Sequence, residues 1–198
     1  MKGARVLLVR HGQSTWNADE RWQGQADPPL SDLGERQARA AVSAVAKLAP
    51  TRVVTSDLGR ARRTAELLAP AGVPVEADPL WRERDAGEWT GLTRNEIEEQ
   101  FPGWLGARRS PPGFEGDDAL LARTLPALLA LVDADGGDVV LVVTHGGVIG
   151  TLERHLDAPG VRVPNLGGRW FHGQDGRVAL GDRDVLVDAE IVTVPDQI

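Results

Sequence analysis

The stretch VLLVRHGQST at Val6–Thr15 carries the strongest structural signal in the chain. Its apolar run ends abruptly at Arg10 and His11, and a second run, VVLVV at Val139–Val143, ends just before His145. Runs of this kind are typical of strands that are buried on both faces of a parallel sheet. Because ligands bind beyond the carboxyl ends of such strands, we expect His11 and His145 to approach the same crevice.

Segments with helical periodicity separate these two strands from further short ones. The predicted helices are Ser31–Leu48 with Ser31 as N-cap, one between Ser56 and Pro70, one after the capping box of Thr93 and Glu96, Ala119–Val132, which Pro126 either kinks or splits, and Val148–Leu156. The further strands are Val53–Val54, Val73–Val75 and edge strands with turns within Gly167–Asp184. This alternation predicts an α/β fold, namely a three-layer α/β/α sandwich with a mostly parallel central sheet.

The chain length predicts a single domain. With 198 residues the chain can bury one sizeable core, and it contains no linker long enough to separate two. We therefore expect residues 1–198 to form one domain. Phe101–Asp118, which is rich in proline and glycine, is predicted to be a long irregular insertion. Loops of this length in compact domains commonly serve as lids or binding elements.

The composition argues against several classes of protein. A formal net charge of -7 and a pI near 5.1 argue against a nucleic-acid-binding protein, which usually carries a basic face. The chain has no cysteine and no metal-binding motif, so we expect neither disulfides nor a metal or other cofactor. The apolar run at Val6–Val9 is too short for a signal peptide or a membrane span, which predicts a cytoplasmic protein with no membrane partner. The sequence does not specify an oligomeric state.

His11 is the candidate nucleophile. A neutral imidazole can accept a phosphoryl group on one ring nitrogen while the other nitrogen is held as a donor. The alternative is a structural histidine at a strand end, but the neighbouring Arg10 and the second strand ending at His145 favour catalysis. Arg10, His145 and Arg60 would then form a cationic cradle for phosphoryl oxygens. The pattern alone does not separate Arg60 from the arginines at positions 62 and 63.

Glu83 is the candidate general acid, which would protonate the leaving alcohol and then activate water. Asp85 and Glu88 are rival carboxylates, and their spacing does not decide among the three. Further polar residues could donate hydrogen bonds to phosphate oxygens, although a capping or turn role suits the first two equally well: Ser14, Asn17 and the Gln23–Gly24 pair.

Five segments, in this order, resemble motifs of the histidine phosphatase superfamily, in its phosphoglycerate-mutase-like branch. They are VRHGQSTWN at Val9–Asn17, WQGQADPPLSDLGERQA at Trp22–Ala38, SDLGRARRTAE at Ser56–Glu66, RERDAGEWTGLT at Arg82–Thr93 and VTHGG at Val143–Gly147. Each motif alone is modest, but five in sequence are highly specific. The likeness covers most of residues 5–156.

The resemblance implies a phosphoglycerate-mutase-like fold and a metal-independent enzyme in which His11 becomes phosphohistidine. It implies that Arg10, Arg60 and His145 form the phosphate pocket, and it selects Glu83 as the proton donor. The residues expected to bind the substrate, from the resemblance and from their polar character, are Ser14, Asn17, Gln23, Gly24 and Gly146.

Within this family the reaction divides between hydrolysis and mutase transfer. Mutases typically follow their second histidine with Gly-Asn-Ser, whereas this chain has His145-Gly146-Gly147, which favours a phosphatase acting on a small-molecule phosphomonoester. Arg108 and Arg109 in the insertion resemble the basic lid of mutases, so a mutase is the first alternative. A catalytically silent module that binds phosphorylated ligands is the second, and against it both His11 and Glu83 are present. The sequence does not name the substrate or its pathway.

Overall fold

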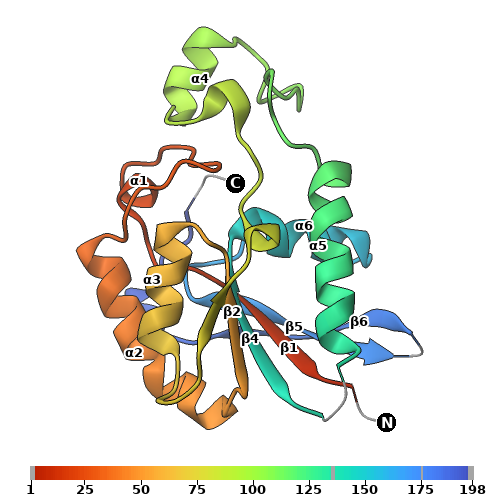
Figure 1. Ribbon diagram of the computed structural model, residues 1–198. Coiled ribbons are helices and arrows are strands. Elements are labelled where there is room, and N and C mark those ends of the chain that lie inside the picture. Colours follow the sequence, from red (N-terminus) through yellow and green to blue (C-terminus); the bar gives the residue numbers. More distant parts are fainter. Residues whose placement is uncertain (1–2, 135–136, 175, 196–198) are drawn as a thin grey trace.

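The computed structural model describes residues 3–134, 137–174 and 176–195. They form one six-stranded sheet with the order β3-β2-β4-β1-β5-β6, covered by helices (Figure 1). The strands are β1 (Arg5–Arg10), β2 (Arg52–Thr55), β3 (Val75–Ala77), β4 (Val139–Thr144), β5 (Gly167–Gln174) and β6 (Arg177–Val185). The helices are α1 (Thr15–Ala18), α2 (Asp32–Leu48), α3 (Gly59–Leu68), α4 (Arg94–Gln100), α5 (Asp117–Val132) and α6 (Gly146–His155), with short 3-10 helices at Pro79–Trp81, Gly87–Trp89 and Ala189–Ile191.

The sheet is mixed but mostly parallel, which confirms the predicted α/β class. Strands β3, β2, β4 and β1 run parallel to one another, whereas β5 pairs antiparallel with both β1 and β6. The first strand of the chain therefore lies in the interior of the sheet. The predicted edge region at the carboxyl end is a hairpin in which β6 forms the edge and β5 does not.

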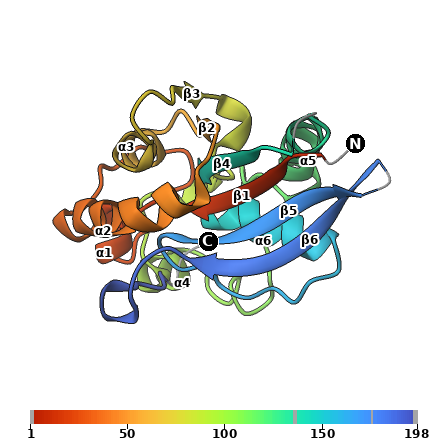
Figure 2. The same cartoon turned by 90° about the horizontal axis from the view of Figure 1, so that it is seen from below.

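Alternate side chains of the central strands build two separate cores, because successive residues of a strand point to opposite faces. Val6 and Leu8 pack with α5 and α6, whereas Leu7 and Val9 pack with α2 and α3. Figure 2 shows these two helical layers on opposite sides of the sheet. The three-layer sandwich predicted from the alternation of strands and helices is confirmed.

Two predicted helix starts are confirmed by their capping contacts. The Ser31 side chain accepts a hydrogen bond from the Gly34 N–H at 3.1 Å at the start of α2. Thr93 and Glu96 form a reciprocal capping box at α4, in which each side chain accepts from the other residue's N–H, at 3.2 and 2.7 Å. Satisfying these otherwise unpaired N–H groups fixes where each helix begins.

Other predicted boundaries are wrong by two residues. The strand predicted at Val73–Val75 is β3, which begins at Val75. The Val73 N–H bonds to the Pro70 carbonyl in a turn, and Pro74 has no N–H to donate to a sheet, so neither residue pairs with β2. Helix α5 begins at Asp117 instead of Ala119 and continues past Pro126 as a single helix, so of the two alternatives at Pro126, a kink or a split, the split is excluded.

Helix α6 begins at Gly146, two residues before the predicted start at Val148. His145 is its N-cap in an extended conformation, with φ of -129° and ψ of 162°, so the helix starts directly after the histidine. Across the described ranges, no helix is both long and apolar enough to cross a membrane.

The insertion at Phe101–Asp118 is irregular up to the start of α5, as predicted. Phe101, Trp104 and Phe114 pack against a small apolar cluster that includes the buried Trp22 and Trp89. This cluster is separate from the two cores of the sheet, so the insertion packs on a small third core of its own.

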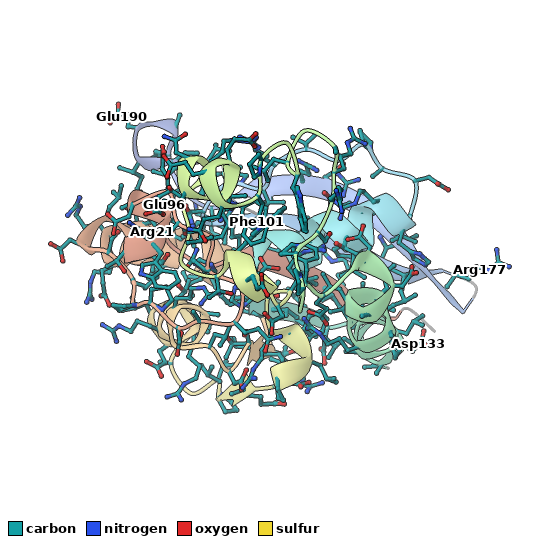
Figure 3. All side chains as sticks on the ribbon, turned by 90° about the horizontal axis from the view of Figure 1, so that it is seen from above. Arg21, Glu96, Phe101, Asp133, Arg177 and Glu190 are labelled. Carbon is teal, nitrogen blue, oxygen red and sulfur yellow. The ribbon has the colours of Figure 1, made fainter. Side chains whose placement is uncertain are left out.

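Ion pairs lie on both sides of the insertion, one at α4 and one at α5. Next to α4, Arg21 and Glu96 lie side by side, with 2.9 Å between nitrogen and oxygen (Figure 3). At the carboxyl end of the insertion, Glu115 receives two hydrogen bonds from Arg123 of α5, at 2.9 and 2.8 Å. The second pair anchors the insertion to the main body of the protein.

Candidate active site

Two neighbouring strands bring the histidines together. Strands β1 and β4 pair in parallel with Arg10 opposite Thr144, and the His11 N–H donates to the Thr144 carbonyl at 3.0 Å. Both imidazoles are buried, and their ring centroids lie 5.1 Å apart. The two strand ends therefore deliver His11 and His145 to one place.

Two contacts define the tautomer of His11. Its Nδ1 lies 2.6 Å from the carbonyl oxygen of Gly12, which can only accept, and its Nε2 lies 3.2 Å from Nε of Arg60, which can only donate. The proton is therefore on Nδ1, and Nε2 carries the lone pair. Burial lowers the pKa of His11 well below its usual value, and the charges of Arg60 and Arg10 lower it further. The imidazole is thus neutral at pH 7, the form that a nucleophile needs.

Arg10 and Arg60 place two buried guanidinium groups beside His11. Arg60, in the first turn of α3, donates to the carbonyls of Ala26 and Gly24 at 2.6 and 2.9 Å. Arg10 donates to the carbonyl of Val163 at 2.9 Å. Burial lowers the pKa of each arginine to about 10, against the opposing effect of a nearby carboxylate. Both arginines remain positively charged at neutral pH.

His145 is buried without a hydrogen-bond partner for either ring nitrogen among the described residues, and the same is true of Nε of Arg10. Burial lowers the pKa of His145 well below its usual value, and Arg60, His11 and Arg10 add to this effect. Buried polar atoms without partners are rare and costly. Their position beside His11 suits a polar ligand that bears several oxygens.

Glu83 is buried, and each of its carboxyl oxygens is held by a backbone N–H. Oε1 accepts from Arg84 at 2.8 Å, and Oε2 accepts from Gly147 at 2.9 Å. Gly147 lies in the first turn of α6, so the start of this helix holds the Glu83 side chain. Arg123 of α5 also donates to the main-chain carbonyl of Glu83 at 3.1 Å. Side chain and backbone are both fixed in place.

Exposure separates the candidates that the sequence left open. Glu83 and Arg60 are buried, with 4% and 1% of their surface exposed. Their rivals lie on the surface of the protein: Asp85, Glu88, Arg62 and Arg63.

The polar residues of the first loop bond mainly to one another. Ser14 caps α1, accepting from the Asn17 N–H at 3.0 Å, and its hydroxyl donates to Oε1 of Gln23 at 2.7 Å. The capping alternative for Ser14 is therefore confirmed. Gly24 contributes its carbonyl to Arg60 and has φ of 52°, a conformation that glycine adopts without strain.

Three buried polar side chains around His11 were not singled out from the sequence. Gln37 accepts from the Gln13 N–H at 2.8 Å, Thr64 accepts from the Gly12 N–H at 3.1 Å, and Asn165 donates to the His11 carbonyl at 2.8 Å. Only the first leaves a sequence signal. Gln37 is a polar residue within the apolar stripe of its helix, four and eight residues before Ala41 and Val45.

A cavity of about 590 Å³ adjoins the site and shares Arg10, Gly146 and Gly147 with it. Trp22, Trp89 and Phe114 form part of its wall. Its charge is strongly positive, because seven arginines face a single acidic residue, Asp117. These arginines are Arg10, Arg84, Arg94, Arg108, Arg109, Arg154 and Arg162. Within residues 3–134, 137–174 and 176–195, no group of three or more His, Asp or Glu side chains could hold a metal ion.

Comparison with known proteins identifies the family. Residues 6–167 match the model of the histidine phosphatase superfamily (branch 1). A glucosyl-3-phosphoglycerate phosphatase from Mycolicibacterium vanbaalenii is 41% identical over 182 residues, which cover 85% of this chain and 81% of the relative. A probable phosphoglycerate mutase GpmB from Klebsiella pneumoniae is 40% identical over 156 residues, covering 75% and 72%.

A solved structure agrees with these sequence relationships. The structure of a mycobacterial glucosyl-3-phosphoglycerate phosphatase in complex with VO3 matches with a TM-score of 0.82 and 32% identity. The match covers 92% of this chain and 99% of that one. Sequence and structure thus agree across most of the chain, which belongs to branch 1 of the histidine phosphatase superfamily.

Proposed function

We propose that this chain hydrolyses a small acidic phosphomonoester through a phosphohistidine formed on His11. The chain is a phosphoric monoester hydrolase of the histidine phosphatase superfamily. One observation carries the proposal. A neutral His11 presents its Nε2 lone pair beside the buried guanidinium of Arg60, next to the unpartnered imidazole of His145.

In the first step, Nε2 of His11 attacks phosphorus, and the bond from phosphorus to the ester oxygen breaks. Glu83 gives its proton to that oxygen, so the product leaves as a neutral alcohol. The incoming phosphoryl group displaces the contact between Arg60 and Nε2. The guanidinium groups of Arg60 and Arg10 and one N–H of His145 then stabilise the charge on the phosphoryl oxygens.

In the second step, a water oxygen attacks phosphorus, and the bond between nitrogen and phosphorus breaks. Glu83, which was left ionised by the first step, takes the proton of the attacking water. Hydrogen phosphate leaves, and both His11 and Glu83 return to their starting forms. The two steps consume only the ester and one water.

The cavity supports a substrate with a second anionic group and a sugar. Two of the proteins compared above are named as glucosyl-3-phosphoglycerate phosphatases, and the name of that ester describes a phosphate, a carboxylate and a glucosyl group. We propose a substrate of this class, in which arginines such as Arg108 and Arg109 bind the carboxylate and Trp22, Trp89 and Phe114 contact the sugar. The volume of about 590 Å³ is in the range of small-molecule sites.

We also propose that residues 1–198 act as one domain and that Phe101–Asp118 is its lid. The residues around the bound phosphoryl group are Ser14, Asn17, Gln23, Gly24 and Gly146. Of these, Gln23 bonds to Ser14, Gly24 bonds to Arg60, and Gly146 lies next to Arg10.

A phosphoglycerate-type mutase is the second candidate. It is supported by Arg108 and Arg109, which line the cavity, and by the relative named as a probable phosphoglycerate mutase. Against it stands Gly147, at the place where mutases typically have asparagine. A mutase would interconvert phosphoglycerates faster than it releases phosphate, and a bisphosphorylated primer would stimulate it strongly.

The decisive experiment measures phosphate release from a generic aryl phosphate and from glucosyl-3-phosphoglycerate, with and without a chelator. We expect turnover of both esters, faster with the acidic sugar ester, and no effect of the chelator. Phosphate label should be trapped on His11 during turnover, and His11→Asn should abolish both turnover and labelling. Inactive wild-type protein, loss of turnover with the chelator, or label on another residue would overturn the proposal.

A further inference from the structure

The two peptide units around Gly12 have every polar group bonded. In the first unit, the His11 carbonyl accepts from Asn165 at 2.8 Å and the Gly12 N–H donates to Thr64 at 3.1 Å. In the second unit, the Gly12 carbonyl accepts from Nδ1 of His11 at 2.6 Å and the Gln13 N–H donates to Gln37 at 2.8 Å. Side chains supply all four partners.

The second unit connects Gln37 to the imidazole through one rigid plane. A peptide group is planar, with its C=O and its N–H pointing in opposite directions. The Gly12 carbonyl that holds Nδ1 of His11 therefore cannot rotate unless the Gln13 N–H also leaves the side-chain oxygen of Gln37. Gln37 thus fixes the orientation of the acceptor that sets the tautomer of His11.

The amide of Gln37 is itself held in one orientation. It is completely buried, and its Nε2 donates to the Ile191 carbonyl at 2.7 Å and to Oγ1 of Thr193 at 3.0 Å. Since the Ile191 carbonyl can only accept and the Gln13 N–H can only donate, a flipped amide would lose both bonds. The oxygen of Gln37 therefore always faces Gln13.

Thr193 closes the network on the other side of the loop. Its hydroxyl donates to Oδ1 of Asn165 at 2.7 Å, and the Asn165 amide nitrogen holds the His11 carbonyl. One hydroxyl on the last described segment thus contacts both side chains that bracket the His11 loop. Gln37 and Asn165 have none of their surface exposed, so their two amides are shielded from water, whereas Thr193 is half-buried.

We propose that Gln37 is a positioning residue that keeps His11 in the tautomer with a free Nε2 lone pair. This inference rests on the proposed role of His11 as nucleophile. In the resting site, Arg60 also favours this tautomer through its bond to Nε2, but the entering phosphoryl group displaces that bond. From then on the Gly12 carbonyl alone holds the proton on Nδ1. A His11 protonated on Nε2 has no lone pair directed at phosphorus and cannot attack.

The test compares wild type with Gln37→Leu, which keeps a similar volume and removes both polar ends. Residues that orient a metal-bound histidine from behind typically contribute about 10- to 100-fold, and by analogy we expect kcat on an aryl phosphate to fall by about that factor. KM should stay unchanged, because Arg10, Arg60 and His145 are intact. Long-range proton–nitrogen NMR of the protein with bound inorganic phosphate, which displaces Arg60 from Nε2, should show pure Nδ1–H His11 in wild type and a mixture of tautomers in the variant.

The control is Thr124→Val, which removes a buried hydroxyl that bonds to the Leu120 carbonyl within α5. It should lower stability without changing kcat or the tautomer of His11. Unchanged kcat in Gln37→Leu, or a lower kcat with pure Nδ1–H His11, would overturn the proposal. If Gln37→Leu does not fold, Gln37→Met tests the same contact because it also lacks the amide, and a tautomer and kcat equal to wild type would refute the proposal.

The NMR measurement needs no turnover, so it separates this inference from the proposed function. Wild-type protein without phosphatase activity would refute the reaction on His11. A tautomer that does not respond to position 37 in an active enzyme would refute only the role of Gln37. Signals of His11 are assigned by their absence from the spectrum of His11→Asn.

Discussion

Gly147 donates its backbone N–H to Oε2 of Glu83 at 2.9 Å, and a Cβ added at Gly147 would fall on the same carboxyl group. The second glycine after His145 is therefore required by the general acid. The preceding Gly146 is similarly constrained, because its Cβ would lie 3.1 Å from Nη1 of Arg10. The pair of glycines in this motif leaves room for two charged side chains.

Gly147→Ala should displace the Glu83 carboxyl group and lower kcat. A shift of about 1 Å in a reacting group costs on the order of 100-fold, and this loss should appear in kcat measured with glucosyl-3-phosphoglycerate. An aryl phosphate with a good leaving group needs less protonation and should lose less. Gly116→Ala, where an added Cβ meets no atom within 4 Å, should retain wild-type activity. Full activity in Gly147→Ala would refute the role of Glu83.

Arg109→Ala should weaken binding of the acidic substrate. Arg109 lines the cavity and lies over the Trp104 ring at 4.4 Å. Loss of a charge-assisted hydrogen bond to a carboxylate should raise KM for glucosyl-3-phosphoglycerate on the order of 10- to 100-fold. KM for a simple aryl phosphate should not change. Arg177→Ala, at the far hairpin labelled in Figure 3, is the matched control, and an equal effect of the two variants would contradict the assignment.

Stability should fall as the pH drops below about 6.5, the usual pKa of histidine. His11 and His145 both have a folded-state pKa below their value in the unfolded chain. The unfolded state therefore binds more protons in this range, and acid favours unfolding. Glu153, whose pKa burial raises, acts in the opposite direction at lower pH. Urea unfolding of His145→Asn should show a weaker dependence on pH than wild type, and an identical dependence would contradict the pKa assignment.

Arg123 and Glu115 should stabilise the protein cooperatively. The two side chains are 18% and 16% exposed, and Arg123 also donates to the carbonyls of Leu80 and Glu83. In a double-mutant cycle with Arg123→Met and Glu115→Gln, we expect a coupling of about 0.5–3 kcal/mol in the free energy of unfolding. Coupling near zero would mean that the insertion is not anchored by this pair.

Much of the fold could be predicted from local sequence patterns. The continuous apolar runs at Val6–Val9 and Val139–Val143 identify buried parallel strands, and the capping residues Ser31 and Thr93 mark where helices start. The short strand β3 was misplaced because one missing N–H, at Pro74, decides where pairing begins. A short edge strand contains few apolar residues, so the residue at which it begins depends on individual backbone hydrogen bonds and not on the apolar pattern.

The catalytic candidates could be proposed from sequence, but the choice among them required the resemblance or the structure. Glu83 and Asp85 differ by only two positions, yet the first is buried against α6 and the second is exposed. Gln37 and Asn165 were missed for another reason. Both side chains bond to main-chain atoms of the His11 loop. Every residue has these atoms, so the residue types in the loop do not indicate which side chains bind there.

The position of β1 between β4 and β5 also determines when the protein can become active during its synthesis. His11 follows β1 directly, but both strands that border β1 come from later in the chain, within residues 139–174. On the ribosome, β1 can therefore pair only after β4 and β5 have been made. Contacts between such distant segments form slowly, which leaves an apolar strand unpaired in the nascent chain. The nucleophile is thus translated long before the strands that fix its position.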